Sequence, residues 1–164
     1  MTICIVHDSE LGNGERLSSA MRDRLQSAGH TVTVGHERTL SASHTVASSP
    51  DLLIVGSAVR KFSLSPVTKR WIDDLRRELS SLPAEARPRA AIFITHGLKP
   101  TTTDRKGQRL LKRLRSAVGP DHVYPNWISA RVSGQEGPFR DGVEAAVMEE
   151  IDAVVDWAAG RQGG

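Results

Sequence analysis

Short apolar runs alternate with longer amphipathic stretches along the whole chain. The five runs are residues 2–6, 30–35, 51–56, 90–95 and 122–132, the last of them interrupted at Pro125. The third run, DLLIVG, is apolar at consecutive positions, which is typical of a central parallel strand that is covered on both faces. Alternation of such strands with helices predicts an α/β fold with a mainly parallel sheet.

Apolar residues recur at helical spacing between these runs. The first stripe is Leu17, Met21, Leu25 and Ala28, and Gly29 is expected to end that helix. A second helix is expected to open at Ser65 and Pro66, because serine caps free amides and proline fits the first helical position. Its stripe is Val67, Trp71, Leu75 and Leu79.

Two further helices are predicted near the C-terminus. One covers residues 105–119, and the other covers residues 143–158 with Asp141 as its expected cap. Residues 36–50 are serine-rich and weakly periodic, so a loop with a brief helix is expected there. These elements form one predicted domain over residues 1–159, followed by a flexible tail over residues 160–164.

Composition adds few constraints. The chain has 164 residues, of which 38% are hydrophobic and 25% charged, as in an ordinary globular protein. We expect a cytoplasmic protein without a membrane segment, because no apolar run approaches about 18 residues and no signal sequence is recognisable. The single cysteine, Cys4, is interpreted as a buried thiol, and the scattered histidines do not predict a metal site.

The net charge of +3 is a mild positive bias that does not by itself predict nucleic-acid binding. Much of the excess is expected on the helix over residues 105–119. This helix carries Arg105, Lys106, Arg109, Lys112, Arg113 and Arg115. The sequence leaves two interpretations open, a solvated helix face and a docking surface for an acidic partner or nucleic acid.

Three loops that follow predicted strands carry the candidate chemistry. They cover residues 7–16, 56–66 and 95–104. In an open parallel sheet, ligands bind outside the carboxyl ends of the strands, where the strand order reverses. In the first loop, Gly12 and Gly14 permit close backbone approach, while Ser9 and Asn13 offer hydrogen bonds just before a helix N-terminus. From residue types alone, a phosphate site and a plain turn both remain possible.

Three segments resemble the flavodoxin-like family. DSELGNGER, residues 8–16, resembles the flavodoxin phosphate loop, and IVGSAVRKFSLSPVTKRWIDDL, residues 54–75, resembles the second flavin loop and the helix after it. GQEGPFRDGVEAAV, residues 134–147, is similar to a segment that precedes the last helix in one branch of the family. The resemblance implies a three-layer sandwich with a five-stranded parallel sheet of order 2-1-3-4-5, and a noncovalent FMN at the switch point.

The resemblance also assigns residues to the flavin. Those expected around the phosphate are Ser9, Glu10, Leu11, Gly12, Asn13, Gly14 and Glu15. Those expected beside the isoalloxazine ring are Ser57, Ala58, Val59, Arg60, Lys61 and Phe62 on one side, and Thr95, His96, Gly97, Leu98 and Lys99 on the other. Arg60, Lys61 or His96 would stabilise an anionic reduced flavin, and backbone groups near Gly56 and Gly97 would contact its N5 atom.

The function that follows is an FMN-binding electron-transfer protein or a small flavin oxidoreductase, acting as a monomer or homodimer with a redox partner protein. The positive net charge suggests an acidic partner. The alternative is a flavodoxin-fold protein that has lost FMN and serves as a binding or regulatory module through its basic helix.

Overall fold

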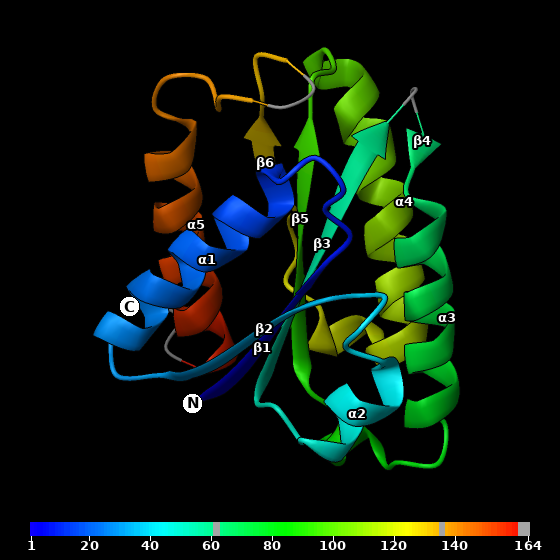
Figure 1. Ribbon diagram of the computed structural model, residues 1–164. Helices are drawn as coiled ribbons and strands as arrows, with labels where there is room; N and C mark the ends of the chain where they lie inside the picture. The colour runs from blue at the N-terminus through cyan, green and yellow to red at the C-terminus, as the bar shows by residue number, and fades with distance from the viewer. Residues whose placement is uncertain (61–62, 135–136, 161–164) are drawn as a thin grey trace.

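A parallel sheet forms the centre of the protein in our computed structural model, which describes residues 1–60, 63–134 and 137–160 (Figure 1). The parallel strands are β1 (Thr2–His7), β2 (Thr31–His36), β3 (Leu52–Arg60), β5 (Arg89–His96) and β6 (Ile128–Arg131). They lie in the order β2-β1-β3-β5-β6. This confirms the predicted α/β class, and the parallel strands alone follow the order 2-1-3-4-5.

A short sixth strand corrects the prediction of a five-stranded sheet. Strand β4 (Ser63–Leu64) pairs antiparallel with the end of β3, so that Val59 faces Leu64 and Arg60 faces Ser63. With β4 counted, the order of the parallel strands reads 2-1-3-5-6. Two residues are too few to show a strand period, so this pairing could not be predicted from the sequence.

Strands β1, β2, β3 and β5 continue beyond their apolar runs, β3 the furthest, and this also differs from the prediction. Residues 57–60, expected in a loop, extend β3, and Ser57 and Ala58 pair with Ile94 and Thr95 of β5. His96, also expected in a loop, is the last residue of β5, directly after Thr95 at the end of the predicted apolar run. Polar residues at a sheet edge look like loop residues in the sequence, although their backbone groups still join the ladder.

Strand β3 lies in the middle of the core, and its side chains alternate between the two faces of the sheet. Leu52 and Ile54 belong to the hydrophobic cluster on one face, and Leu53 and Val55 belong to the cluster on the other. At Gly56, a Cβ atom would lie 2.1 Å from Cζ of the buried Phe93. Glycine is therefore required at this position by the packing of Phe93.

The helices form a layer on each face of the sheet (Figure 1). Helices α1 (Asn13–Ser27) and α5 (Val143–Ala158) cover one face. Helices α2 (Ala42–Ala47), α3 (Pro66–Leu79) and α4 (Pro100–Val118) cover the other. The short 3-10 helices η1 (Ala84–Ala86) and η2 (Pro120–His122) lie in connections. The described part of the chain contains no helix that is long and apolar enough to cross a bilayer.

The helix ends agree with the sequence in part. Ser65 caps α3 as predicted, because its side chain accepts hydrogen bonds from the amides of Val67 and Thr68. Helix α4 starts at Pro100 and not at Arg105, so residues 100–104 are helical where a loop was expected. The predicted cap of α5 is also wrong, because Gly142 with φ of 76° precedes the helix in place of Asp141.

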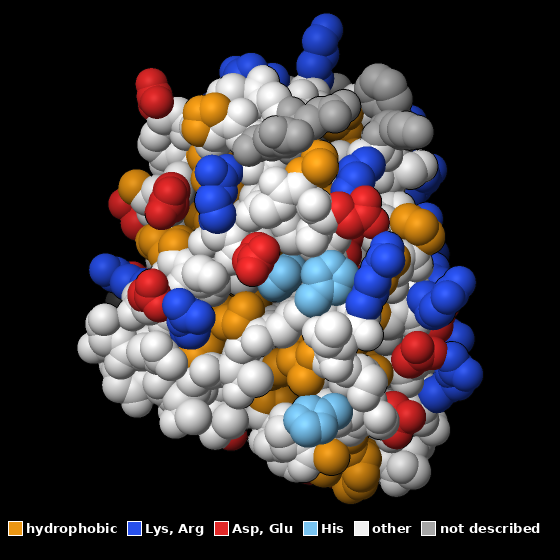
Figure 2. Space-filling view, viewed as in Figure 1, with side chains coloured by type: hydrophobic (Ala, Val, Ile, Leu, Met, Phe, Trp, Pro, Cys, Tyr) orange, Lys and Arg blue, Asp and Glu red, His pale blue; other side chains and the backbone are white. Residues whose placement is uncertain are grey.

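Charge is distributed unequally between the two helical layers. Helices α3 and α4 carry ten Lys and Arg residues against four Asp and Glu. Helix α5, on the opposite layer, carries five acidic residues and none that is basic. Figure 2 shows Lys and Arg side chains along the right-hand edge, on the side where Figure 1 places α3. The positive excess of the chain therefore belongs to one layer.

Candidate ligand site at the carboxyl edge of the sheet

The loop between β1 and α1 lies where the strand order reverses. From β1 the chain passes through α1 to β2 on one side, while β3 pairs with β1 on the other. Neighbouring connections diverge at such a point and leave room for a ligand at the carboxyl ends of the strands. Of the residues that the resemblance assigns to the phosphate, the first four lie in this loop, and Asn13, Gly14 and Glu15 begin α1.

Gly12 gives the loop its shape. Its φ of 82° lies in the left-handed region, which glycine adopts without steric cost, and its carbonyl accepts the first helical bond from the amide of Arg16 at 2.9 Å. Gly12 has no side chain that could cap the amides of the first turn. These amides and the positive end of the helix dipole form an arrangement that favours an anion.

Gly14 lies where the loop approaches the N-terminus of the helix closely. A Cβ atom at this position would lie 3.2 Å from Cβ of Ser9, so a larger residue would push the loop outward. Ser9 is held from the other side, because its amide donates to Nδ1 of His7 at 3.3 Å. The glycines at positions 12 and 14 therefore hold the loop against the N-terminus of α1.

Asn13 and Arg16 connect this loop to the segment before α5. Oδ1 of Asn13, a side chain that is 7% exposed, accepts a hydrogen bond from Nη2 of Arg16 at 2.7 Å. The guanidinium of Arg16 also lies 5.5 Å from the centre of the Phe139 ring. A Cβ at Gly137 would lie 2.4 Å from Nη2 of Arg16. Two of the three segments that carry the family resemblance are therefore in direct contact, with a cationic side chain between them.

Asp8 joins the loop to β3. This side chain is only 3% exposed, and its Oδ1 accepts a hydrogen bond from the amide of Ala58 at 2.9 Å. Nη2 of Arg60 donates to the carbonyl oxygen of Asp8 at 2.6 Å. Burial raises the pKa of the Asp8 carboxyl, while hydrogen bonds and Arg60 oppose this shift. The contacts of Asp8 bring the first and second candidate segments together.

Two arginines offset the charge of Glu10. Its carboxylate lies 2.7 Å from Nη1 of Arg60 and 3.0 Å from Nη2 of Arg38. Glu10 and Arg38 are largely exposed, so these pairs contribute little to stability. Their relevance is local, because they reduce the negative charge beside a loop whose amides would receive an anion.

Glu37 is a second buried carboxyl behind the loop. It follows β2, is 5% exposed, and its Oε2 accepts a hydrogen bond from the hydroxyl of Thr68 at 3.0 Å. Its amide donates to the carbonyl of His7 at 2.8 Å. Burial, and then the charge of Asp8, raise the pKa of Glu37 to about 9. The carboxyl is therefore protonated at neutral pH.

The third candidate segment has its histidine turned into the protein. Nε2 of His96 lies 2.8 Å from the hydroxyl of Ser129, and Nδ1 accepts from the amide of Leu98 at 3.3 Å and lies 3.2 Å from the hydroxyl of Thr103. Burial, and then the charge of Arg131, lower the pKa of His96. The side chain is neutral at neutral pH and already hydrogen-bonded, whereas Gly97 has open space where a Cβ would lie.

The predicted site residues are thus brought to one edge of the sheet to different degrees. Ser9 to Gly14 and Ala58 to Arg60 are connected through Asp8 and Glu10. Ser57 is buried, Val59 pairs with β4, and Thr95 pairs with Ala58. Lys61 and Phe62 lie outside the described residues. Sequence reasoning missed the roles of Asp8 and Glu37, although both are acidic residues directly beyond predicted strands.

Solved structures with a similar backbone include flavodoxins and flavodiiron proteins. A WrbA-like flavodoxin from Agrobacterium tumefaciens has a TM-score of 0.72 and 16% identity, over 98% of this chain and 99% of its own. Oxidised flavodoxin 1 from Bacillus cereus has a TM-score of 0.71 and 14% identity, over 95% of this chain and 98% of its own.

A larger protein contains the same fold as one part. The rubredoxin:oxygen oxidoreductase of Desulfovibrio gigas has a TM-score of 0.73 and 12% identity, and the match covers 99% of this chain but 37% of that protein. No protein-family model matches the chain, and no curated protein matches it in sequence. At these identities the similarity concerns the arrangement of the backbone. The chain has a flavodoxin-like fold.

Proposed function

We propose that the carboxyl edge of the sheet binds FMN and that the protein transfers electrons to or from a redox partner protein. The observation that carries this proposal is the loop around Gly12, which presents the uncapped first turn of α1 at the point where the strand order reverses. Phosphate groups bind at such helix N-termini. Asn13 and the cationic Arg16 lie at the same place.

The residues fit the phosphate end of FMN best. The amides from Glu10 to Glu15 would surround the phosphate, and Arg38 and Arg60 would offset the charge of Glu10. The ring would lie against the backbone of Ser57 to Arg60 and beside Gly97, where a Cβ would meet open space. When bound, FMN supplies the one- and two-electron chemistry that amino-acid side chains lack.

The surrounding residues would set the conditions for that chemistry. Arg60 is fixed by Asp8 and Glu10 at the end of β3, so a positive charge is held beside the proposed ring position. A cation near a flavin favours its anionic reduced form and raises its potential. His96 is neutral and hydrogen-bonded to other residues, so Arg60 is the stronger candidate for this role.

Flavin content tests the proposal directly. The purified protein is expected to be yellow, to absorb light at about 450 nm, and to release FMN on denaturation. If it is purified without flavin, added FMN is expected to bind, with quenching of the flavin fluorescence. A colourless protein that does not take up FMN would overturn the proposal and favour the alternative of a binding or regulatory module.

A matched pair of variants locates the phosphate. Asn13→Asp keeps the oxygen that accepts from Arg16 but adds a negative charge at the first turn of α1. We expect FMN affinity to fall by about tenfold or more, because one charge-assisted contact is worth about 1.5–3 kcal/mol. The control is Asn126→Asp, the same change at the only other asparagine of the chain, which is exposed. Equal affinities in the two variants would place the phosphate elsewhere.

A further inference from the structure

The outer surface of α4 is basic along most of its length. The cationic residues of the helix, with the residue before it, are Lys99, Arg105, Lys106, Arg109, Lys112, Arg113 and Arg115, whereas Asp104 is its one acidic residue. Within the part of the chain that the structure describes, only Arg113 among these cations forms an ion pair, with Asp73 of α3. Most of this charge is therefore available to a partner.

This surface begins beside the candidate ligand site. Helix α4 starts at the carboxyl edge of the sheet, directly after the loop at Gly97 that would border the flavin ring. At a rise of 1.5 Å per residue, Arg105 and Arg109 lie about 8 and 14 Å along the helix from Pro100. Both side chains are exposed. A protein that contacts both arginines is therefore placed next to this loop.

Helix α3 widens the basic surface on one side. It lies along α4 (Figure 1), and Nε of Arg113 donates to the carbonyl oxygen of Lys69 at 3.2 Å while its guanidinium pairs with Asp73. Lys69 is itself partly exposed. We define the basic face as Lys69, Lys99, Arg105, Lys106, Arg109 and Lys112.

The strand ends at the same edge of the sheet add positive charge. Arg60 ends β3, and Arg131 ends β6, where it pairs with His96 of β5. The nearby carboxylates are less available to a partner, because Asp8 is only 3% exposed and Glu10 forms ion pairs with arginines. The edge of the candidate site that adjoins the basic face is therefore positive as well.

We propose that the basic face receives the acidic surface of a small electron-transfer protein, an inference that rests on the proposed flavin function. Complementary charge would steer this partner and fix its orientation. The position of Arg105 and Arg109 would hold its redox centre beside the loop at Gly97.

A nucleic acid fits the basic face less well. Asp104 is exposed directly before Arg105, and Asp73 lies between α3 and α4. A continuous phosphate backbone would be repelled by such carboxylates, because its affinity comes from cations that neutralise successive phosphates. A folded partner can instead place its own basic residues opposite them.

Calorimetric titration with an acidic plant-type ferredoxin, an iron–sulfur electron carrier, tests the proposal. We expect saturable binding at about 50 mM salt that weakens several-fold at about 150 mM, because salt screens exposed charges. Amide NMR shifts are expected at Lys99, Arg105 and Arg109, with small shifts on α5. Cytochrome c, a basic electron carrier, is the control and is expected not to bind. Equal binding of the two carriers, or no ferredoxin binding up to about 1 mM, would overturn the proposal.

A matched pair of charge reversals locates the contact. Arg105→Glu is expected to weaken ferredoxin binding about tenfold, and Arg105→Lys to retain most of it. The control is Arg76→Glu, the same change at an exposed arginine near the far end of α3, and we expect less than about a twofold loss. Each variant is first checked for an unfolding transition like that of the unmodified protein. Equal losses in the two Glu variants would show that only net charge attracts ferredoxin, and would overturn the proposal.

Two further measurements separate this proposal from its alternatives. A DNA duplex of about 20 base pairs that binds more tightly than ferredoxin at about 150 mM salt, with shifts at the same residues, would identify a nucleic-acid surface instead. All titrations are made with and without added FMN. Ferredoxin binding at the basic face of a protein that takes up no FMN would overturn the flavin function alone. Uptake of FMN without ferredoxin binding would overturn the docking proposal alone.

Discussion

At the scale of single residues, Glu37 combines burial with an incomplete set of hydrogen bonds. Its Oε2 accepts from Thr68, while Oε1 is buried without a partner among the described residues. A charged carboxylate in this position would be poorly solvated and would lie close to Asp8, which explains a pKa of about 9. The protonated form avoids both costs, so the folded protein holds a proton that the unfolded chain releases.

The stability of the protein is therefore expected to depend on pH through Glu37. The pKa of Glu37 in the folded protein, about 9, lies above its usual value of 4.5. The stability that Glu37 contributes is therefore fully present below pH 4.5 and is lost as the pH rises toward 9. In Glu37→Gln this dependence is absent. We expect the difference in unfolding free energy, variant minus unmodified protein, to be larger at pH 9 than at pH 4.5 by at least about 1 kcal/mol.

Urea unfolding at several pH values measures this difference. Glu85→Gln, at an exposed carboxyl, is the control and is expected to follow the unmodified protein at each pH. Unfolding free energies of Glu37→Gln that run parallel to those of the unmodified protein would show that Glu37 is ionised in the fold.

The local residue chemistry of the candidate loop could be predicted, but its partners could not. Gly12 is recognisable because it stands between a strand and a helix and is followed by a helical stripe. Asp8 and Glu37 were missed because Ala58 and Thr68 are 50 and 31 positions away along the chain. Only the assembled sheet brings these groups together.

At the scale of elements, the contact between α4 and the residues before β6 depends on a glycine. A Cβ at Gly107, within α4, would lie 2.4 Å from Cε2 of Trp127. Alanine ordinarily favours a helix over glycine by about 1 kcal/mol. Here the indole ring occupies the space, so packing opposes the intrinsic preference.

The variant Gly107→Ala is accordingly expected to lose about 1–3 kcal/mol of stability, as overpacked sites do. The double variant Gly107→Ala/Trp127→Leu is expected to lose less than the sum of the two single changes, because the smaller side chain removes the clash. Thermal or urea unfolding of the four proteins measures the coupling. Additive losses would mean that Trp127 moves aside without cost.

Element boundaries were predicted well where a core stripe marks them. Leu17, Met21 and Leu25 are buried on α1, and Trp71, Leu75 and Leu79 on α3, as their spacing predicts. The first turn of α4 and the end of β3 were missed, because no recurring apolar stripe marks either segment. Backbone hydrogen bonds and not side-chain burial define these ends.

At the scale of the whole molecule, the two helical layers have opposite charge. Helices α3 and α4 have an excess of six positive charges, and α5 has five negative charges. The net charge of +3 hides this separation. An anionic surface would attract the α3 and α4 layer far more than the overall charge suggests.

Chromatography on heparin tests this asymmetry. Replacing Arg105, Arg109 and Lys112, three exposed residues of α4, by Gln is expected to shift elution to clearly lower salt and to reduce the salt dependence of binding by about the number of lost contacts. Replacing Arg22, Arg24 and Arg140 lowers the net charge equally from other surfaces and is expected to have a smaller effect. Equal shifts would mean that only the net charge matters.

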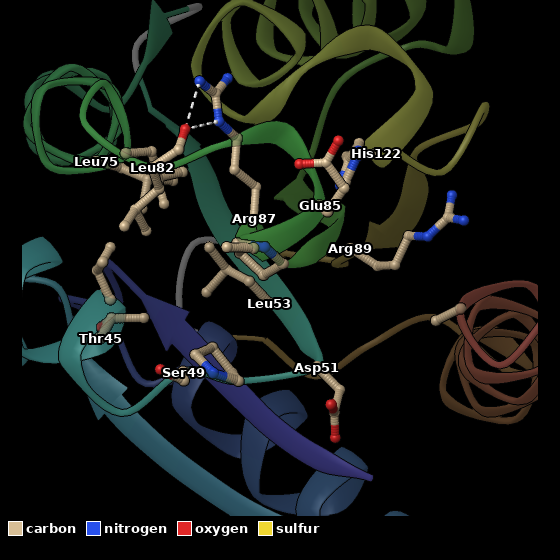
Figure 3. Close-up of a pocket in the computed structure, with 16 residues that line it drawn as sticks. Thr45, Ser49, Asp51, Leu53, Leu75, Leu82, Glu85, Arg87, Arg89 and His122 are labelled. Carbon is tan, nitrogen blue, oxygen red and sulfur yellow. Dashed lines mark hydrogen bonds between the residues drawn. The ribbon is translucent and has the colours of Figure 1, made fainter.

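The family resemblance predicted the fold of the molecule, although no single motif did. Loop glycines, a strand order and a capped helix each occur in many proteins, but together they match one arrangement of the sheet. A cavity of about 490 Å³ at the amino-terminal edge of the sheet (Figure 3) could not be foreseen, because its lining comes from seven elements whose residues otherwise look like ordinary core and connection.

Strand β3 runs from Leu52 at the amino-terminal edge of the sheet to Arg60 at the carboxyl edge, and its eight steps of about 3.3 Å place these two ends about 26 Å apart. This is several times the distance of about 8 Å over which charges are screened at physiological salt. Exposed charges at the amino-terminal edge are therefore largely screened from the candidate ligand site. A label or a tether to a support is accordingly best attached at the amino-terminal edge.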